Sequence, residues 1–139
     1  MSFFKRNKKE IKKNPIQWKI TQRCLNLILE SAKSIYPKEF GGFLRVDDIK
    51  KDLISEIVLI PGTVSGESHA IFKLNMLPVD FNIVGTVHSH PSQYPIPSGP
   101  DLELFRKHGR VHIIAANPFN EKSWKGYNYQ GKSIDIKVI

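Results

Sequence analysis

The stretch IVGTVHSHPSQYPIPSGPD, residues 83–101, decides the fold of this chain. Residues 83–87 form a short, apolar run rich in β-branched side chains, a pattern typical of a buried strand. Two histidines follow at positions 88 and 90, just past the expected strand end, and residues 91–100 form a loop rich in proline and serine. Residues 101–107 have helical spacing, with Leu102 and Phe105 on one face, and Gly109 stops the helix. The stretch therefore predicts a buried strand, an irregular loop and a helix.

The spacing of His88 and His90 suits a metal ion. Residues i and i+2 of an extended segment point to the same side, so both imidazoles can bind one ion. Asp101 lies eleven positions after His90, beyond a loop that can fold back, and its carboxylate would complete a set of three ligands. Three protein ligands leave the fourth position of a zinc ion open for water, the arrangement of catalytic sites. We therefore predict one zinc ion per chain.

Each of these residues also has a simpler interpretation. Ser98 and Asp101 have the spacing of a capping box, with Pro100 in the first helical turn, so Asp101 could be only a carboxylate favoured at a helix start. The histidines could be two solvated imidazoles at the end of a strand. The joint occurrence of His-Ser-His-Pro and Ser-Gly-Pro-Asp favours the metal site.

Other segments predict the elements around this stretch. A helix is expected from the N-cap Thr21 to Pro37. Phe43 and Leu44 then begin a strand with Gly41 and Gly42 at its entry, where glycine suggests a close backbone approach or a bulge. Further expected elements are strands at 54–60, 70–74 and 111–116, a turn at Pro61-Gly62, and a hairpin of 123–129 with 133–139 around Gln130-Gly131. Mixed strands with a helix before and a helix within predict an α/β sandwich around one sheet.

Composition and length indicate one domain. The chain has 139 residues, of which 40% are hydrophobic and 24% charged, and this is ordinary for a globular protein. Its single cysteine, Cys24, excludes an intramolecular disulfide and lies on the apolar face of the expected helix. No segment approaches the roughly 20 apolar residues of a membrane span, and no apolar secretory segment follows the basic N-terminus. We expect a cytoplasmic protein without a membrane partner.

The net charge of +8 is unevenly distributed. Residues 1–13 contain six basic residues and one acidic residue, a net charge of +5, and we expect them to form a basic arm ahead of a domain at 14–139. Such an arm can bind nucleic acid or an acidic partner, although no nucleic-acid-binding motif accompanies it. The simpler interpretation is a solvated terminus.

Two motifs resemble the JAMM (MPN-plus) family of zinc metalloproteases. Glu39-Phe40-Gly41-Gly42-Phe43-Leu44 resembles its Glu-x-x-Gly-hydrophobic-Leu signature, and His88-Ser89-His90-Pro91 with Ser98 and Asp101 resembles its His-x-His-Pro…Ser-x-x-Asp motif. The resemblance covers most of the chain except residues 1–13, and it is greatest to archaeal members.

The resemblance implies a cytidine-deaminase-like α/β/α fold and zinc-dependent hydrolysis of peptide or isopeptide bonds. It implies that His88, His90 and Asp101 hold the zinc, that Glu39 is the general base and that Ser98 stabilises the oxyanion. The implied substrates are ubiquitin-like modifier or sulfur-carrier proteins and their conjugates, cut after a C-terminal Gly-Gly. The chain has no room for the large insertions of linkage-specific relatives, so a minimal catalytic core is expected.

Alternatives remain at this stage. One is a non-catalytic MPN scaffold, which the complete ligand set disfavours. Another is the RadC-type branch, associated with DNA metabolism, whose usual helical DNA-binding module is not visible here. A nucleoside deaminase is disfavoured because its Cys-x-x-Cys ligands are absent. His69, His108 and His112 are expected to have no direct role, Ser89 and Pro91 to shape the loop, and Trp18 and Trp124 to pack in the core.

Overall fold

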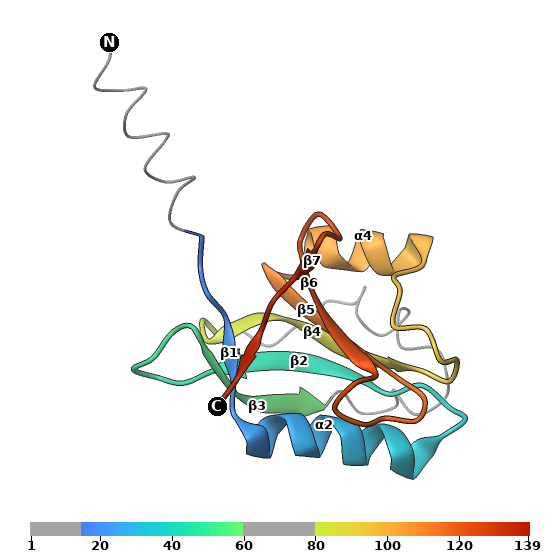
Figure 1. Cartoon of the computed structure of the whole chain (residues 1–139). Helices are drawn as coiled ribbons and strands as arrows, with labels where there is room; N and C mark the ends of the chain where they lie inside the picture. Colours follow the sequence, from blue (N-terminus) through green and yellow to red (C-terminus); the bar gives the residue numbers. More distant parts are fainter. Residues whose placement is uncertain (1–14, 60–79) are drawn as a thin grey trace.

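The computed structural model describes residues 15–59 and 80–139, which form one curled sheet with a helix on each side (Figure 1). Helices α2 and α4 lie on opposite sides of the strands, so the predicted α/β/α sandwich with one mixed sheet is confirmed. The elements are β1 (Lys19–Ile20), α2 (Gln22–Ile35), β2 (Gly41–Val46), β3 (Leu53–Leu59), β4 (Ile83–His90), α4 (Gly99–Lys107), β5 (Val111–Ala116), β6 (Trp124–Asn128), β7 (Ser133–Ile134) and β8 (Lys137–Val138).

Within the described residues, the sheet has eight strands in the order β7-β6-β5-β4-β2-β3-β1-β8. Strand β4 lies at its centre, parallel to β5 and antiparallel to β2. β7 and β8 occupy opposite ends of this order, yet only residues 135 and 136 separate them in the chain. Such a link spans roughly 11 Å at most, whereas the edges of a flat eight-stranded sheet would lie about 34 Å apart. The sheet must therefore curl until its two edges approach.

The expected C-terminal hairpin is only partly correct. β6 and β7 pair antiparallel around Gln130-Gly131, as predicted, but the pairing ends at Ile134. The reason is that Ile136 turns inward and is 6% exposed, after which β8 pairs parallel with β1 at the other edge. β1 itself was not predicted, because two residues are too short to show a periodic pattern.

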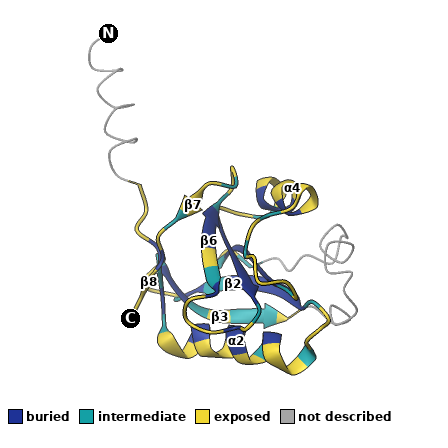
Figure 2. Ribbon diagram, turned by 45° about the vertical axis from the view of Figure 1, so that its right-hand side comes forward, coloured by how far each residue is buried: buried dark blue, intermediate teal, exposed yellow. Residues whose placement is uncertain are grey.

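Helix α2 follows its sequence signals at both ends. The side chain of Thr21 accepts a hydrogen bond from the Cys24 amide at 3.0 Å, and the last helical residue lies two positions before Pro37. The helix packs an apolar face against the sheet, with its exposed face outward (Figure 2). Leu27 would have been placed on the apolar face by its helical spacing from Cys24 and Ser31, but it is 51% exposed. The buried residues are Cys24, Leu25, Ile28, Leu29 and Ala32.

Gly42 lies inside β2 rather than before it, and the expected close backbone approach is confirmed. A Cβ atom at position 42 would lie 2.7 Å from the main-chain oxygen of Val58 on β3. Backbone crowding is greater at Gly85 on β4, where a Cβ would lie 1.5 Å from the main-chain oxygen of Val111. A side chain is therefore excluded at these two positions, where β2 lies close to β3 and β4 lies close to β5.

The apolar core has one part under each helix. The larger part lies between α2 and the sheet and includes Trp18 and Cys24, with Trp124 packed against it as predicted. The smaller part lies under α4 and contains Phe43, Leu104, Phe105, Ile114 and Tyr127. In the described part of the chain, neither helix is long and apolar enough to cross a membrane. The expected strand at 70–74, the turn at Pro61-Gly62 and the arm at 1–13 lie outside the described residues.

Candidate metal centre

The C-terminal end of β4 carries both histidines. They were expected just past the strand, but His88 and His90 lie within it. The strand continues this far because its parallel pairing with β5 extends to the pair His90–Ala116, and β2 pairs Gly41 with His88 on the other side. Residues i and i+2 of a strand face the same way. The two imidazoles therefore share one side of the sheet, with the side chain of His88 fully buried and that of His90 15% exposed.

The first turn of α4 brings Asp101 to the histidines. Ser98 is the N-cap, and its side chain accepts a hydrogen bond from the Asp101 amide at 3.2 Å. The Asp101 carboxylate accepts in return from the Ser98 amide at 2.9 Å, which completes a capping box. These bonds orient the carboxylate, and it is fully buried. The capping interpretation of Asp101 is therefore correct, and the same geometry directs the carboxylate toward β4.

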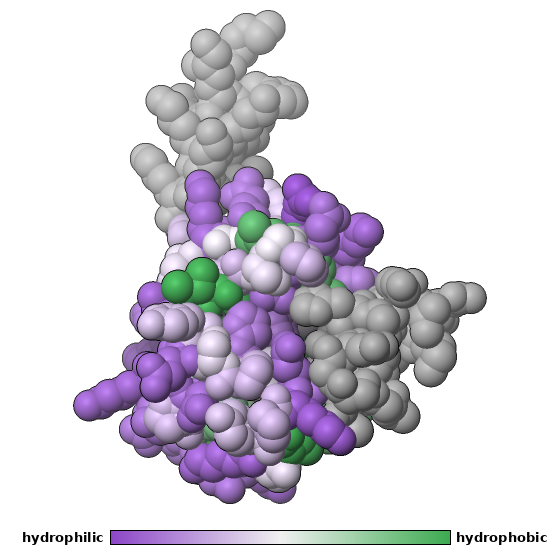
Figure 3. Space-filling view, turned by 90° about the vertical axis from the view of Figure 1, so that its right-hand side faces the viewer, coloured by the Kyte–Doolittle hydropathy of each residue, from purple (hydrophilic) through white to green (hydrophobic). Residues whose placement is uncertain are grey.

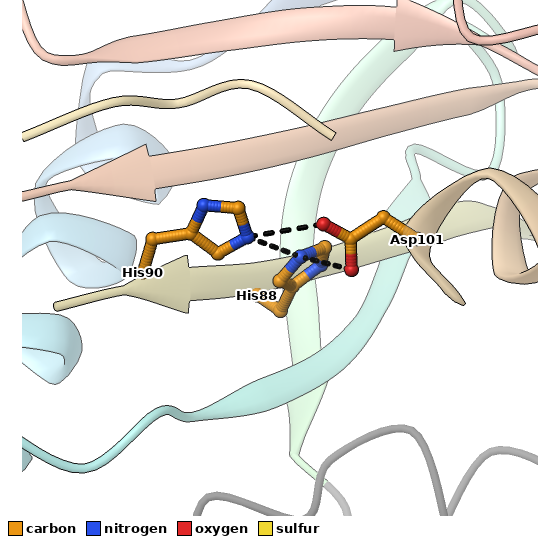
Figure 4. Close-up of side chains that lie close together, drawn as sticks. All are labelled: His88, His90 and Asp101. Atoms are coloured by element: carbon orange, nitrogen blue, oxygen red, sulfur yellow. Dashed lines mark hydrogen bonds and ion pairs between the residues drawn. The ribbon is translucent and has the colours of Figure 1, made fainter. Parts of the chain in front are cut away.

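Three side chains converge in Figure 4. The Nε2 atoms of His88 and His90 lie 3.2 Å apart; that of His88 lies 3.1 Å from Asp101 Oδ1, and that of His90 lies 3.1 Å from Asp101 Oδ2. One ligand atom from each residue falls in a group within 4.8 Å. In a tetrahedral zinc site with bonds of about 2.0–2.1 Å, neighbouring donor atoms lie about 3.3 Å apart. The donor spacing and the His/His/Asp chemistry therefore fit a zinc ion.

The same contacts set the protonation of His90. Burial by itself lowers the pKa of this imidazole, but the hydrogen bond with Asp101 and the Tyr94 carbonyl oxygen, 3.1 Å from Nδ1, outweigh it. The pKa of His90 is raised as a result. A carboxylate beside two imidazoles thus offers negative charge that a proton or a metal cation can neutralise.

Glu39 lies at the rim of this cluster. It is half-buried, directly before β2, and its charge helps to raise the pKa of His90. Two hydrogen bonds fix the adjacent residue: the Phe40 amide donates to Ser89 Oγ at 2.9 Å, and the Ser89 amide donates to the Phe40 carbonyl at 3.1 Å. Glu39 does not belong to the three-donor group. The fold therefore places a second carboxylate near the cluster but outside it.

The other described histidines lie apart from the cluster. His108 caps the C-terminus of α4 through its main chain. His112 is buried on β5, where Nδ1 accepts from the Thr86 amide at 3.2 Å and Nε2 faces the Gly109 carbonyl at 3.1 Å. Neither joins the three-donor group, as expected, whereas His69 lies outside the described residues.

Comparisons with known proteins agree with this geometry. Residues 21–127 match the family described as prokaryotic homologs of the JAB domain. The chain belongs to this JAB-domain family. A probable metalloprotease of Haloferax volcanii is 32% identical over 127 residues, covering 86% of this chain and 78% of the relative.

Two solved structures resemble this JAB-domain protein. A JAB1/MPN domain protein from Archaeoglobus fulgidus is 38% identical with a TM-score of 0.70, covering 87% of this chain and 98% of its own. A structure described as JAMM, a metalloprotease-like zinc site in the proteasome and signalosome, is 36% identical with a TM-score of 0.69, covering 88% and 97%. The resemblance found in the sequence is confirmed, and with the three-donor cluster it supports a metallohydrolase.

Sequence reasoning missed two contributors to this JAB-domain site. One is the clamp between Ser89 and Phe40, whose signal is the small hydroxyl residue between the two histidines. The other is the main-chain oxygen of Tyr94 against His90. No side-chain pattern could have revealed the second contact, because any residue supplies a carbonyl.

Proposed function

We propose that this JAB-domain protein is a zinc-dependent metalloprotease that hydrolyses peptide or isopeptide bonds. His88, His90 and Asp101 would hold one zinc ion per chain. The observation that carries the proposal is the convergence of the three side chains: the two Nε2 atoms lie 3.2 Å apart, and each lies 3.1 Å from its own oxygen of Asp101, distances that suit the ligands of one zinc ion. The name of the Haloferax volcanii relative, a probable metalloprotease, supports the same chemistry.

Each residue at the rim has a chemical task in this proposal. A bound zinc would supply a Lewis acid that polarises a carbonyl and acidifies water. Glu39 accepts the proton of the attacking water and returns it to the leaving amine, a task for a carboxylate near the metal that is not a ligand. Ser98 is exposed at the start of α4, and its hydroxyl donates a hydrogen bond to the developing oxyanion.

We further propose that the substrate is a ubiquitin-like protein or its conjugate, cut after a C-terminal Gly-Gly. Two of the three ligand side chains are fully buried, and only His90 is partly exposed, so the scissile bond must come close to the protein surface. Glycines without Cβ atoms permit this approach. The described part of the face on the right of Figure 1, where the chain passes from β4 to α4, is mainly hydrophilic (Figure 3). Polar and main-chain contacts are therefore expected in recognition.

The experiment is to incubate the pure protein with a ubiquitin-like protein joined through its Gly-Gly terminus to a lysine side chain. We expect cleavage that a chelator stops and added zinc restores. The Glu39→Gln variant, nearly equal in shape but unable to accept the proton, should lose hydrolysis and keep its metal. Turnover by Glu39→Gln at the wild-type rate would exclude Glu39 as the base.

Metal content is measured separately from activity. Elemental analysis of protein purified without added metal should give about one zinc per chain, and His88→Ala with His90→Ala should remove it. Stoichiometric zinc in that double variant would place the metal elsewhere. A cleavable linear Gly-Gly fusion, assayed beside the lysine conjugate, distinguishes peptide from isopeptide preference.

A further inference from the structure

The orientation of His90 depends on a carbonyl in the loop that follows it. Nε2 of His90 faces His88 and Asp101, while Nδ1 lies 3.1 Å from the main-chain oxygen of Tyr94. A carbonyl can only accept, so this contact keeps a proton on Nδ1, and Nε2, which hydrogen-bonds with Asp101, is the nitrogen that would bind a metal on losing its own proton. The direction of the Tyr94 carbonyl thus orients the ring and determines which nitrogen is available to a metal.

The residue after Tyr94 makes that carbonyl stiff. The peptide bond between Tyr94 and Pro95 is planar, and the ring of Pro95 holds its φ angle near −65°. The only soft backbone dihedral between the carbonyls of Tyr94 and Pro95 is therefore ψ of Pro95. A contact that holds the Pro95 carbonyl consequently restrains the Tyr94 carbonyl as well.

Tyr127 on β6 provides that contact. Its hydroxyl donates a hydrogen bond to the Pro95 carbonyl, 32 residues earlier in the chain. The ring is 5% exposed on β6 and stacks with Phe105 of α4 at a centroid separation of 5.8 Å. Burial raises the pKa of Tyr127, so the hydroxyl keeps its proton and remains a donor at neutral pH.

We propose that Tyr127 is a positioning residue for the metal centre, acting through the Pro95 and Tyr94 carbonyls to hold the imidazole of His90. The path runs from a buried tyrosine on β6 to the loop after β4 and from there to a proposed ligand. The inference rests on the proposed zinc site for its effect on metal binding. Its structural part, the orientation of His90, is measurable without metal.

The first experiment compares Tyr127→Phe with Tyr129→Phe, a matched control at a half-exposed tyrosine. Competition with a chelator should show zinc affinity reduced about tenfold in Tyr127→Phe, the lower end of the range seen when a group that holds a metal ligand in place is removed. The visible spectrum of the cobalt-substituted protein should change in the same variant, because the ligand field senses the orientation of His90. Tyr129→Phe should match the wild type in both. Wild-type affinity and spectrum in Tyr127→Phe would overturn the proposal.

A second variant tests the path itself. Pro95→Gly keeps the Tyr127 hydroxyl but frees the φ angle that couples the two carbonyls, so it should give a similar loss. The double variant should then be no worse than the single ones, because both break one path. Fully additive losses would mean that the two residues act independently, against the proposal.

Side-chain nitrogen NMR of the metal-free protein separates this inference from the proposed function. The ring-nitrogen signals of His90 should move in Tyr127→Phe, while those of His108 stay in place. Unmoved His90 signals would overturn the inference. If they move but the wild type binds no zinc, the proposed function fails and the positioning role of Tyr127 stands.

Discussion

Acid should destabilise the metal-free protein through His112. This imidazole is fully buried, and burial lowers its pKa to about 4 from an ordinary value of 6.5. Above pH 6.5 it is neutral in both the folded and unfolded states and contributes no pH dependence. Below pH 6.5 the unfolded chain binds a proton that the folded chain excludes, so stability falls until the pH reaches the folded pKa. At about 1.36 kcal/mol per unit, the full loss is roughly 3 kcal/mol, of which about 2 kcal/mol is lost by pH 5.

The assay is urea unfolding between pH 7.5 and 5, with chelator present, for the wild type and His112→Asn. The asparagine oxygen can still accept from Thr86, but the ring stacked on Phe105 at 4.3 Å is lost. The variant should be less stable at pH 7.5, and the difference should shrink by about 2 kcal/mol at pH 5 because asparagine does not titrate. A difference that stays constant across this range would refute the reasoning.

Three further predictions concern the frame of the site. Ser98→Ala should reduce the rate of hydrolysis about 10²–10³-fold and lower the free energy of unfolding by about 1 kcal/mol through the lost helix cap. Ser98→Thr, assayed beside it, should retain most of the rate and of the stability. A wild-type rate in the alanine variant would show that Ser98 takes no part in the chemistry. Gly85→Ala should lower the free energy of unfolding, measured in urea, by about 1–3 kcal/mol or more, because its Cβ would lie 1.5 Å from the Val111 oxygen. Gly99→Ala is the control and should be tolerated, because a Cβ there has no neighbour within 4 Å. Equal stability of the two variants would contradict this. Removal of residues 1–13 should leave the melting temperature and the zinc content unchanged. It should weaken the binding of acidic partners only at low salt, because screening limits the reach of charges to about 8 Å at physiological ionic strength. A large drop in melting temperature would show that the arm is a structural element.

The helices and strands that carry local signals, such as caps, prolines or apolar runs, could be predicted from the sequence. Thr21 and Pro37 bounded α2, and the apolar run before His88 predicted β4. The curl of the sheet was not predictable, because it depends on β8 crossing to β1 instead of extending the hairpin. A two-residue strand has no periodicity, and pairing between residues more than 100 positions apart leaves no local pattern.

The candidate site also has a part that the sequence predicted and a part that it did not. Spacing predicted that His88, His90 and Asp101 would meet, because residues i and i+2 share a face of a strand and the loop before Asp101 can fold back. The contacts that hold them were not predictable. The clamp of Ser89 on Phe40 joins residues 49 positions apart, and the Tyr94 carbonyl is main chain. Side-chain patterns therefore identify the donors but not the groups that orient them.

Asp101 connects folding and chemistry more closely than either histidine does. Its carboxylate closes the capping box of α4 and also faces both imidazoles, so replacing it removes a helix cap and a proposed ligand together. Loss of activity in an Asp101 variant would not separate the two effects. His90 lies at the partly exposed side of the cluster, and its position on β4 is held by main-chain pairing with β5 rather than by its side chain. Substitution of His90 can therefore remove metal binding while β4 stays in place, and the zinc proposal is tested most directly there.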